Sequence, residues 1–174
     1  MSKIKISLDY SIPKEDRKKL ISIVKKADAG AEVTEGDLSA MGGITWYPRD
    51  LIIFVASLTA AGFFAALGKD LYIQLRDRIK KLLSEDQPKA GAIYYSYLAF
   101  DIGSTVLYFE VDRINVYSID RAYEKIIEDF PIIKKEVERL IQFKPNKLTG
   151  KFDSITFIFD DLDDQWIIAH FNKY

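Results

Sequence analysis

The sequence of 174 residues has no cysteine and only one histidine. The lack of cysteine excludes disulfides, thiolate zinc sites and thiol nucleophiles, and one histidine cannot complete a metal site built on several imidazoles. Net charge is also nearly absent: 25 basic side chains balance 26 acidic ones, so no overall positive field attracts nucleic acid or an anionic membrane. We therefore expect a non-enzymatic protein with no cofactor, no metal site and no nucleic-acid partner.

The composition is that of a folded domain. Hydrophobic residues make up 48% of the chain, and a domain of this length buries roughly 70% of its unfolded surface. We expect a single domain over residues 1–174: a strand–helix–loop region (1–47), a hydrophobic then amphipathic helix (48–84) and a hairpin–helices–hairpin region (91–174). The amino terminus has no apolar run typical of a secretory signal, and the lack of cysteine fits a reducing compartment, so the expected location is cytoplasmic.

The amino-terminal region predicts one strand and one helix. Residues 3–10 alternate apolar and polar side chains, which is the pattern of a strand with one buried face. Pro13 suits the first turn of a helix, and apolar residues at helical spacing follow it as far as Ala27. Residues 31–47 contain three glycines among small polar residues, which predicts a loop with a short strand near residues 32–34.

The carboxy-terminal half predicts two hairpins with helices between them. Residues 92–100 are aromatic on both faces, which favours a central strand, and residues 105–111 form its returning partner. Two helical stretches follow, which Pro131 should break or kink. Residues 152–159 and 165–171 form the second hairpin. The expected fold class is α+β: about five mostly antiparallel strands packed on a long or broken apolar helix and on shorter amphipathic helices.

Leu51–Gly68 is the most unusual segment, because none of its eighteen residues is charged. An apolar stripe continues beyond it, so we expect a helix from about residue 48 to residue 83. That helix would be about 54 Å long, whereas a domain of this size is roughly 40 Å across. We therefore expect a break, and Gly68 is the expected position because glycine commonly ends helices.

Small residues recur in this segment at spacings of three and four, which permits close approach of a second helix or a sheet. In a bilayer the same pattern is typical of associating helices, and eighteen residues just span the hydrocarbon. Insertion would separate residues 1–50 from every later strand, and a lone strand and helix cannot form a core. We therefore expect contact with protein through Ser57, Ala61, Gly62, Ala65, Ala66 and Gly68.

An acidic run lies in the predicted turn of the second hairpin. It lacks the glycine and the glutamate of a calcium-binding EF-hand loop, so we interpret it as an exposed turn. Its carboxylates offer an electrostatic contact for a basic partner. They belong to Asp160, Asp161, Asp163 and Asp164.

Few other side chains suggest a catalytic or ligand-binding role. We expect His170 on the same face of its strand as Trp166 and Ile168, partly buried and hydrogen-bonded. Five tyrosines are interpreted as core side chains and not as platforms for nucleic-acid bases: Tyr94, Tyr95, Tyr97, Tyr108 and Tyr117. Acid–base catalysis would require carboxylates that converge in the fold. The candidates are Glu110, Asp112 and Asp120, but their spacing in the sequence gives no support for such convergence.

These observations predict a protein that acts by binding. Our first hypothesis is a protein-binding or oligomerisation module that uses the small-residue apolar helix, with a second copy of the chain or another protein as its partner. The first alternative is a membrane-inserting or membrane-associated accessory protein that uses Leu51–Gly68, with the basic run at residues 76–81 on anionic headgroups. The second alternative is an inhibitor or immunity-type module for one cognate protein.

Overall fold

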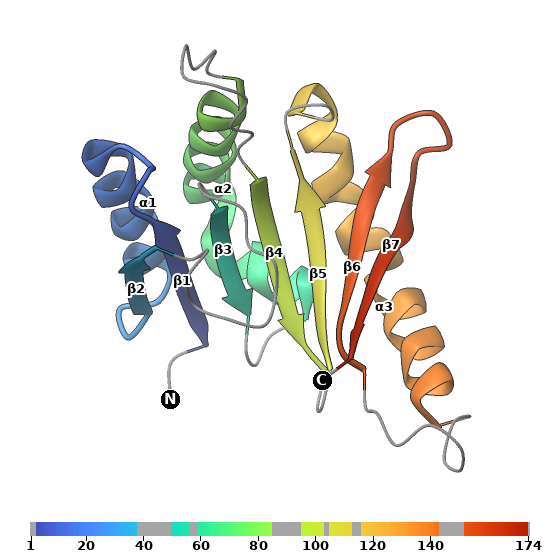
Figure 1. Ribbon diagram of the computed structural model, residues 1–174. Helices are drawn as coiled ribbons and strands as arrows, with labels where there is room; N and C mark the ends of the chain where they lie inside the picture. The colour runs from blue at the N-terminus through green and yellow to red at the C-terminus, as the bar shows by residue number, and fades with distance from the viewer. Residues whose placement is uncertain are drawn as a thin grey trace.

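The computed structural model describes residues 3–37, 50–55, 59–84, 95–102, 105–112, 116–142 and 152–173. They form a single α+β domain in which a sheet of seven strands lies against three helices (Figure 1). The expected fold class is confirmed. The strands are β1 (Ile4–Asp9), β2 (Glu32–Gly36), β3 (Asp50–Val55), β4 (Tyr95–Asp101), β5 (Val106–Val111), β6 (Phe152–Asp160) and β7 (Gln165–Lys173).

The sheet has the strand order β2-β1-β3-β4-β5-β6-β7. Antiparallel pairs (β1 with β3, β4 with β5, β6 with β7) alternate with parallel pairs (β1 with β2, β3 with β4, β5 with β6). The amino-terminal strand, the short strand near residues 32–34 and both hairpins are present as predicted. The sheet is nevertheless larger than the expected five strands, and its parallel pairs are as numerous as its antiparallel ones.

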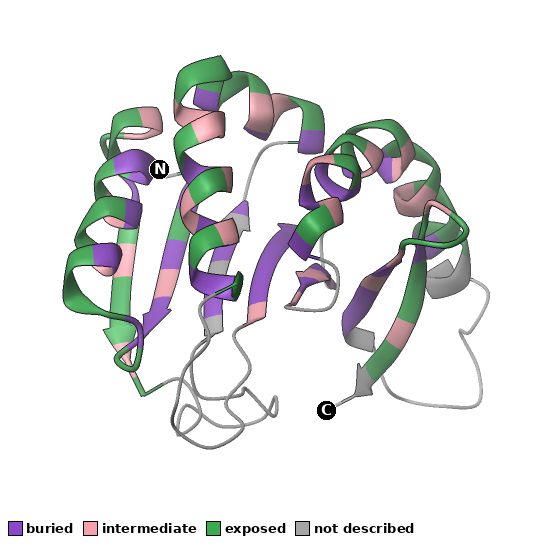
Figure 2. Cartoon of the chain, turned by 90° about the horizontal axis from the view of Figure 1, so that it is seen from above, coloured by how far each residue is buried: buried purple, intermediate pink, exposed green. Residues whose placement is uncertain are grey.

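Each parallel pair is joined through a helix, because the chain must return to the same end of the sheet before it can run in the same direction again. α1 (Lys14–Ala27) joins β1 to β2, and α2 (Ala60–Ser84) joins β3 to β4. A short 3₁₀ helix, η2 (Val116–Ser118), and α3 (Ile119–Gln142) join β5 to β6. All three α-helices lie on one side of the sheet (Figures 1 and 2). We call this side the helix-covered face, and we call the side on which no described helix lies the open face.

The expectation that Leu51–Gly68 forms part of one helix is wrong, because Leu51–Val55 belongs to β3. β3 lies inside the sheet between β1 and β4. Its side chains from Leu51 to Val55 are apolar at every position, so the sequence has no alternation that would distinguish this strand from a buried helix. The helical part begins only at Ala60.

The predicted break at Gly68 is confirmed. Gly68 has φ 67° and ψ 168°, a backbone conformation that residues other than glycine rarely adopt. It divides α2 into a first segment of two turns, Ala60–Leu67, and a longer amphipathic segment that ends at Ser84. No helix among the described parts of the chain combines the length and the apolar character needed to cross a bilayer.

The sequence predicts that Pro131 breaks or kinks the helical region; α3 continues from Ile119 to Gln142 with Pro131 inside it, so Pro131 does not end the helix. Its apolar stripe faces the sheet and includes Ile119, Tyr123, Ile126 and Phe130, all of which are buried. Burial of this stripe supplies the stabilisation that offsets the hydrogen bond lost at the proline.

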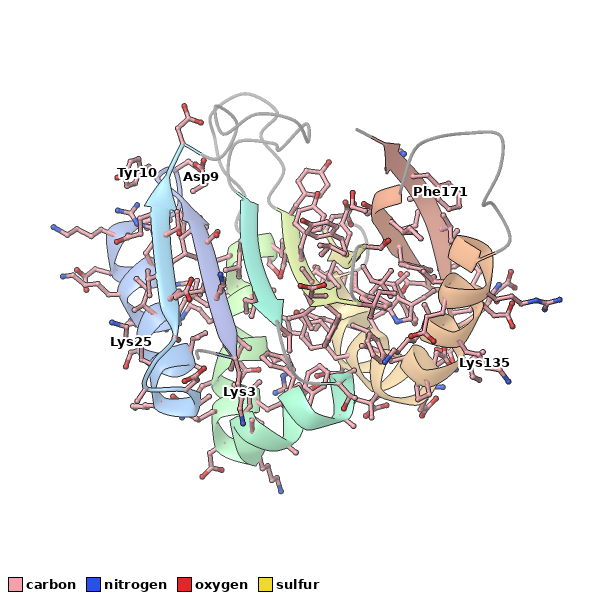
Figure 3. All side chains as sticks on the ribbon, turned by 90° about the horizontal axis from the view of Figure 1, so that it is seen from below. Lys3, Asp9, Tyr10, Lys25, Lys135 and Phe171 are labelled. Atoms are coloured by element: carbon pink, nitrogen blue, oxygen red, sulfur yellow. The ribbon has the colours of Figure 1, made fainter. Side chains whose placement is uncertain are left out.

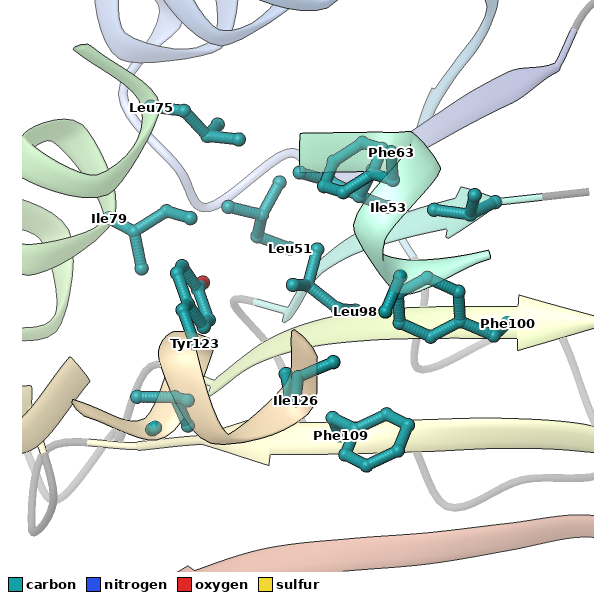
Figure 4. Packing of buried hydrophobic residues seen from close by; sticks show 14 of the residues in the cluster. Leu51, Ile53, Phe63, Leu75, Ile79, Leu98, Phe100, Phe109, Tyr123 and Ile126 are labelled. Carbon is teal, nitrogen blue, oxygen red and sulfur yellow. The ribbon is translucent and has the colours of Figure 1, made fainter. Parts of the chain in front are cut away.

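The core lies between the helix-covered face and the helices (Figure 4). Phe63 from α2, Phe100 from β4, Phe109 from β5 and Tyr123 from α3 are among its largest fully buried side chains. The rings of Phe100 and Phe109 lie edge to face with their centroids 5.8 Å apart. The first segment of α2 is therefore anchored in the core by one side, and its other side points outward.

Candidate functional site

A groove lies between the first segment of α2 and the middle of α3. It has a volume of about 400 Å³, and we call it the α2–α3 groove. The residue that α2 contributes to its wall is an alanine, whose side chain is too short to fill the space beside α3. The lining residues are Thr59, Ala61, Ile127, Phe130, Pro131, Lys134, Lys135 and Glu138.

The structure brings one of the six predicted interface residues into this groove and places four others close by on α2. Ala61 lines the groove and is exposed. Ser57 lies outside the described residues. The remaining predicted residues continue along the same helix: Gly62 is half-buried, and Ala65, Ala66 and Gly68 are exposed.

Sequence reasoning missed the wall that α3 contributes. Ile127 is 39% exposed although it neighbours the buried Ile126, because it lies at the side of the apolar stripe, toward α2. Phe130 is buried and forms part of the floor, and Pro131 is exposed beside it. The only sequence signal for this wall was an apolar residue beside the buried stripe of α3. That signal does not reveal which element packs against this side of the helix.

The rim of the α2–α3 groove carries charges of both signs. The Nζ atom of Lys134 lies 3.8 Å from Oε1 of Glu138, one helical turn away. Lys135 is exposed on the outer surface of α3 (Figure 3), and the described residues provide no ion-pair partner for it. The groove can therefore receive an apolar segment that brings a carboxylate to its edge.

The acidic run forms the turn between β6 and β7, as predicted. Asp160 accepts hydrogen bonds from the backbone N–H groups of Leu162 and Asp163, which closes the turn. Arg121 of α3 donates to Asp164 and lowers the pKa of that carboxyl group. Asp161 and Asp163 are exposed, beside Leu162, which is 96% exposed. The described residues contain no cluster suited to a metal ion.

The expectation for His170 is wrong in two respects. It is exposed, and it lies on the opposite face of β7 from Trp166 and Ile168. The register explains the change of face: Trp166 and Ile168 pair with Phe159 and Phe157, whereas His170 pairs with Thr156. One extra residue in β7, Ala169, makes a bulge that reverses the alternation after Ile168.

The open face of the sheet carries an aromatic cluster next to a carboxylate. Tyr97 and Tyr108 are each 5% exposed, which confirms them as core side chains, and their rings meet edge to face at 6.1 Å. The same expectation is wrong for Tyr117, which lies in η2 and is 87% exposed. Tyr95 is half-buried, and Tyr94 lies outside the described residues. Tyr97 also donates a hydrogen bond to Glu110. Burial raises the pKa of Glu110, and Asp112 adds to the rise, while the hydrogen bond and His170 oppose it.

The three carboxylates that acid–base chemistry would require do not converge. Glu110 and Asp112 are near each other at the end of β5. Asp120 is at the start of α3, where it accepts hydrogen bonds from Arg76 and Lys80 of α2 at 2.9 Å each. Asp120 therefore joins two helices and does not belong to the group on the open face.

The raised pKa of Glu110 leads to a prediction about stability and pH. A group whose pKa is higher in the folded state than its ordinary value of 4.5 stabilises the fold at low pH, and that contribution is lost as the pH rises through the folded-state pKa. Replacing Glu110 by glutamine removes the cost of ionising a partly buried carboxyl group. We expect Glu110→Gln to raise the free energy of unfolding at neutral pH and to leave it nearly unchanged near pH 4.

Urea unfolding at several pH values between about 4 and 7 measures this difference. Asp161→Asn, which removes an exposed carboxylate from the β6–β7 turn, is the matched control. The difference in free energy of unfolding between Asp161→Asn and wild type should not change with pH in this way. If the free energy of unfolding depends on pH in the same way for wild type and Glu110→Gln, then ionisation of Glu110 does not destabilise the folded protein.

A second groove lies between α1 and the longer segment of α2, and its volume is about 650 Å³. Its cationic side chains are Lys19 and Lys26 from α1 and Arg78 and Lys81 from α2. Arg78 donates to the buried Asp16 at 2.6 Å, so part of this charge holds the two helices together. The basic run at residues 76–81 is visible in the sequence, but its convergence with the lysines of α1 depends on the helix pairing.

Comparison of the chain with protein-family models, with curated proteins and with solved structures found no match.

Proposed function

We propose that this protein is a non-enzymatic protein-binding module that forms a homo-oligomer through the α2–α3 groove and the exposed small residues beside it. The observation that carries the proposal is the exposure of Ala61 and Ala65, one turn apart, on a helix whose opposite side is anchored in the core. Alanine at both positions lets the backbone of a second helix approach closely. Ile127 of the groove wall adds apolar surface that association removes from water.

A second copy of the chain is the partner that this surface fits. In a two-fold symmetric contact each copy presents the same surface, so the surface must complement itself. Two short alanine-bearing helices can cross at Ala61 and Ala65 without a clash. The rim supplies both signs of charge, and the same symmetry can place Lys135 of one copy beside Glu138 of the second.

A bulky side chain in the contact tests the proposal. We expect wild-type protein to sediment as a dimer or a larger species, and Ala61→Trp and Ala65→Trp to shift it to a smaller one. Overpacking an interface costs about 1–3 kcal/mol, which raises the dissociation constant roughly 5- to 150-fold. Analytical ultracentrifugation over a range of concentrations measures the shift.

The matched control is Ser22→Trp, which places the same side chain at an exposed position of α1. Circular dichroism should show that all three variants are folded, because the substituted positions are exposed in the single chain. The proposal fails if the wild type sediments as a single copy at every concentration, or if the tryptophan variants associate as strongly as the control.

A further inference from the structure

The groove between α1 and the longer segment of α2, which we call the α1–α2 groove, is lined by one face of each helix. Its lining residues recur at spacings of three and four along each helix, so each wall is a single stripe. Its volume of about 650 Å³ falls in the range of small-molecule sites, roughly 300–1,000 Å³. The two stripes are Lys19, Ser22, Ile23 and Lys26 on α1, and Gln74, Asp77, Arg78 and Lys81 on α2.

Positive charge exceeds negative charge in the α1–α2 groove. Four of its lining residues are lysine or arginine, and only Asp77 is acidic. The carboxylate of Asp77 is already paired with Arg76, which does not line the groove, at 2.7 Å. The groove therefore favours an anionic ligand.

Arg78 is held in place and still has hydrogen-bond donors to offer. Its Nη1 atom donates to Oδ1 of Asp16 at 2.6 Å, and Asp16 is buried. The described residues provide no acceptor for the N–H groups on its Nε and Nη2 atoms. Because the ion pair fixes the guanidinium group before any ligand arrives, less conformational entropy is lost on binding.

Lys19 and Lys26 are exposed, and the described residues provide neither of them with an ion pair. The acidic residues closest to them in α1 have other partners. Glu15 pairs with Lys18 at 3.0 Å, and Asp28 accepts hydrogen bonds from backbone N–H groups at the start of β1. An anion in the groove would therefore meet two ammonium groups that no ion pair neutralises.

We infer that the α1–α2 groove binds a small ligand that carries linked phosphate groups. Lys19 and Lys26 are seven residues apart, which is about 10.5 Å along a helix. The oxygens of a single phosphate surround one phosphorus atom and cannot reach both lysines, whereas a chain of phosphates can. The fork of Arg78 suits two oxygens of one phosphate, and the hydroxyl of Ser22 and the amide of Gln74 supply neutral donors.

The surroundings favour a compact ligand over a long polyanion. The net charge of the chain is −1, so the surface outside the groove supplies no positive field for a nucleic-acid backbone or an anionic membrane. Ile23 is 6% exposed and forms an apolar floor. Charges above such a floor attract an anion more strongly than the same charges fully surrounded by water.

Isothermal titration with sodium tripolyphosphate tests the inference, with orthophosphate as the probe that carries a single phosphate. We expect one tripolyphosphate per chain and a dissociation constant at least about tenfold lower than that of orthophosphate. The Lys19→Ala, Lys26→Ala double variant should raise the dissociation constant of tripolyphosphate at least about tenfold, because it removes the cations at both ends of the α1 wall.

The matched control is the Lys14→Ala, Lys25→Ala double variant, which removes the same charge from the same helix at positions that do not line the groove. Lys25 extends outward from α1 (Figure 3). The control should change the dissociation constant less than about twofold, since distant exposed charges are screened by salt. All four lysines are exposed, so circular dichroism should show that both double variants are folded.

The inference is overturned if tripolyphosphate does not bind, or if both double variants weaken its binding equally. It is also overturned if a single-stranded oligonucleotide or phosphatidylglycerol vesicles, at the same total phosphate concentration, bind more tightly than tripolyphosphate through Lys19 and Lys26. The α1–α2 groove is a different surface from the α2–α3 groove, so Ala61→Trp should leave tripolyphosphate binding unchanged. Failure of either proposal therefore does not decide the other.

Discussion

Phe109→Ala is expected to lower the free energy of unfolding by about 3–5 kcal/mol, the range for removing a large ring from a rigid core. Phe109 is fully buried on β5. Its ring stacks on Phe157 at 5.1 Å and meets Trp166 edge-on at 5.0 Å. The cavity would be surrounded by side chains from strands and from α3, which are held by separate backbone hydrogen bonds and cannot all move inward.

Urea unfolding monitored by tryptophan fluorescence measures the loss, because Trp166 is next to the substituted ring. Tyr117→Ala is the matched control: Tyr117 is 87% exposed, and its replacement should change stability by less than about 0.5 kcal/mol. A loss of less than about 1 kcal/mol for Phe109→Ala would contradict the packing of β5 between β4 and β6 under α3.

Ile53→Asp is expected to lower the free energy of unfolding by more than about 4 kcal/mol, which is enough to unfold most of the protein at room temperature. Ile53 is fully buried on β3, between Ile6 of β1 and Leu98 of β4. A carboxylate at this position has no partner in the apolar surroundings, and protonation would neutralise it only at a further cost. The large effect follows from the position of β3 inside the sheet.

Ile53→Val is the matched control, because it keeps the branched shape that suits a strand and should cost about 0.5–1.5 kcal/mol. Circular dichroism and thermal unfolding distinguish the two variants. A folded Ile53→Asp protein of near-normal stability would show that the segment is not in the core, and the position of β3 would have to be revised.

The difference between β3 and the other strands shows what the sequence could predict. β1 alternates apolar and polar side chains because one of its faces is more exposed. Each hairpin is marked by turn residues between two runs rich in strand-forming side chains. β3 is inside the sheet and apolar throughout, so neither signal exists. The break at Gly68 was predictable because only the length of the helix and the chemistry of glycine were needed.

The candidate site was predictable only in part. The exposed alanines on α2 follow from the composition of one segment. The residues that face them on α3, such as Ile127 and Lys135, are more than sixty positions later in the chain, and only the pairing of the helices brings them together. The bulge at Ala169 was also hidden, because one inserted residue changes the face of His170 without any change in composition.

The most direct test of the proposed association is a distance between two copies at the α2–α3 groove. Because the chain has no cysteine, Lys135→Cys gives a single attachment point for a spin label at the groove rim. We predict a defined distance between labels by pulsed dipolar spectroscopy, which disappears in the Ala61→Trp, Lys135→Cys protein. Absence of any dipolar signal from Lys135→Cys at concentrations well above those used for sedimentation would contradict association through the groove.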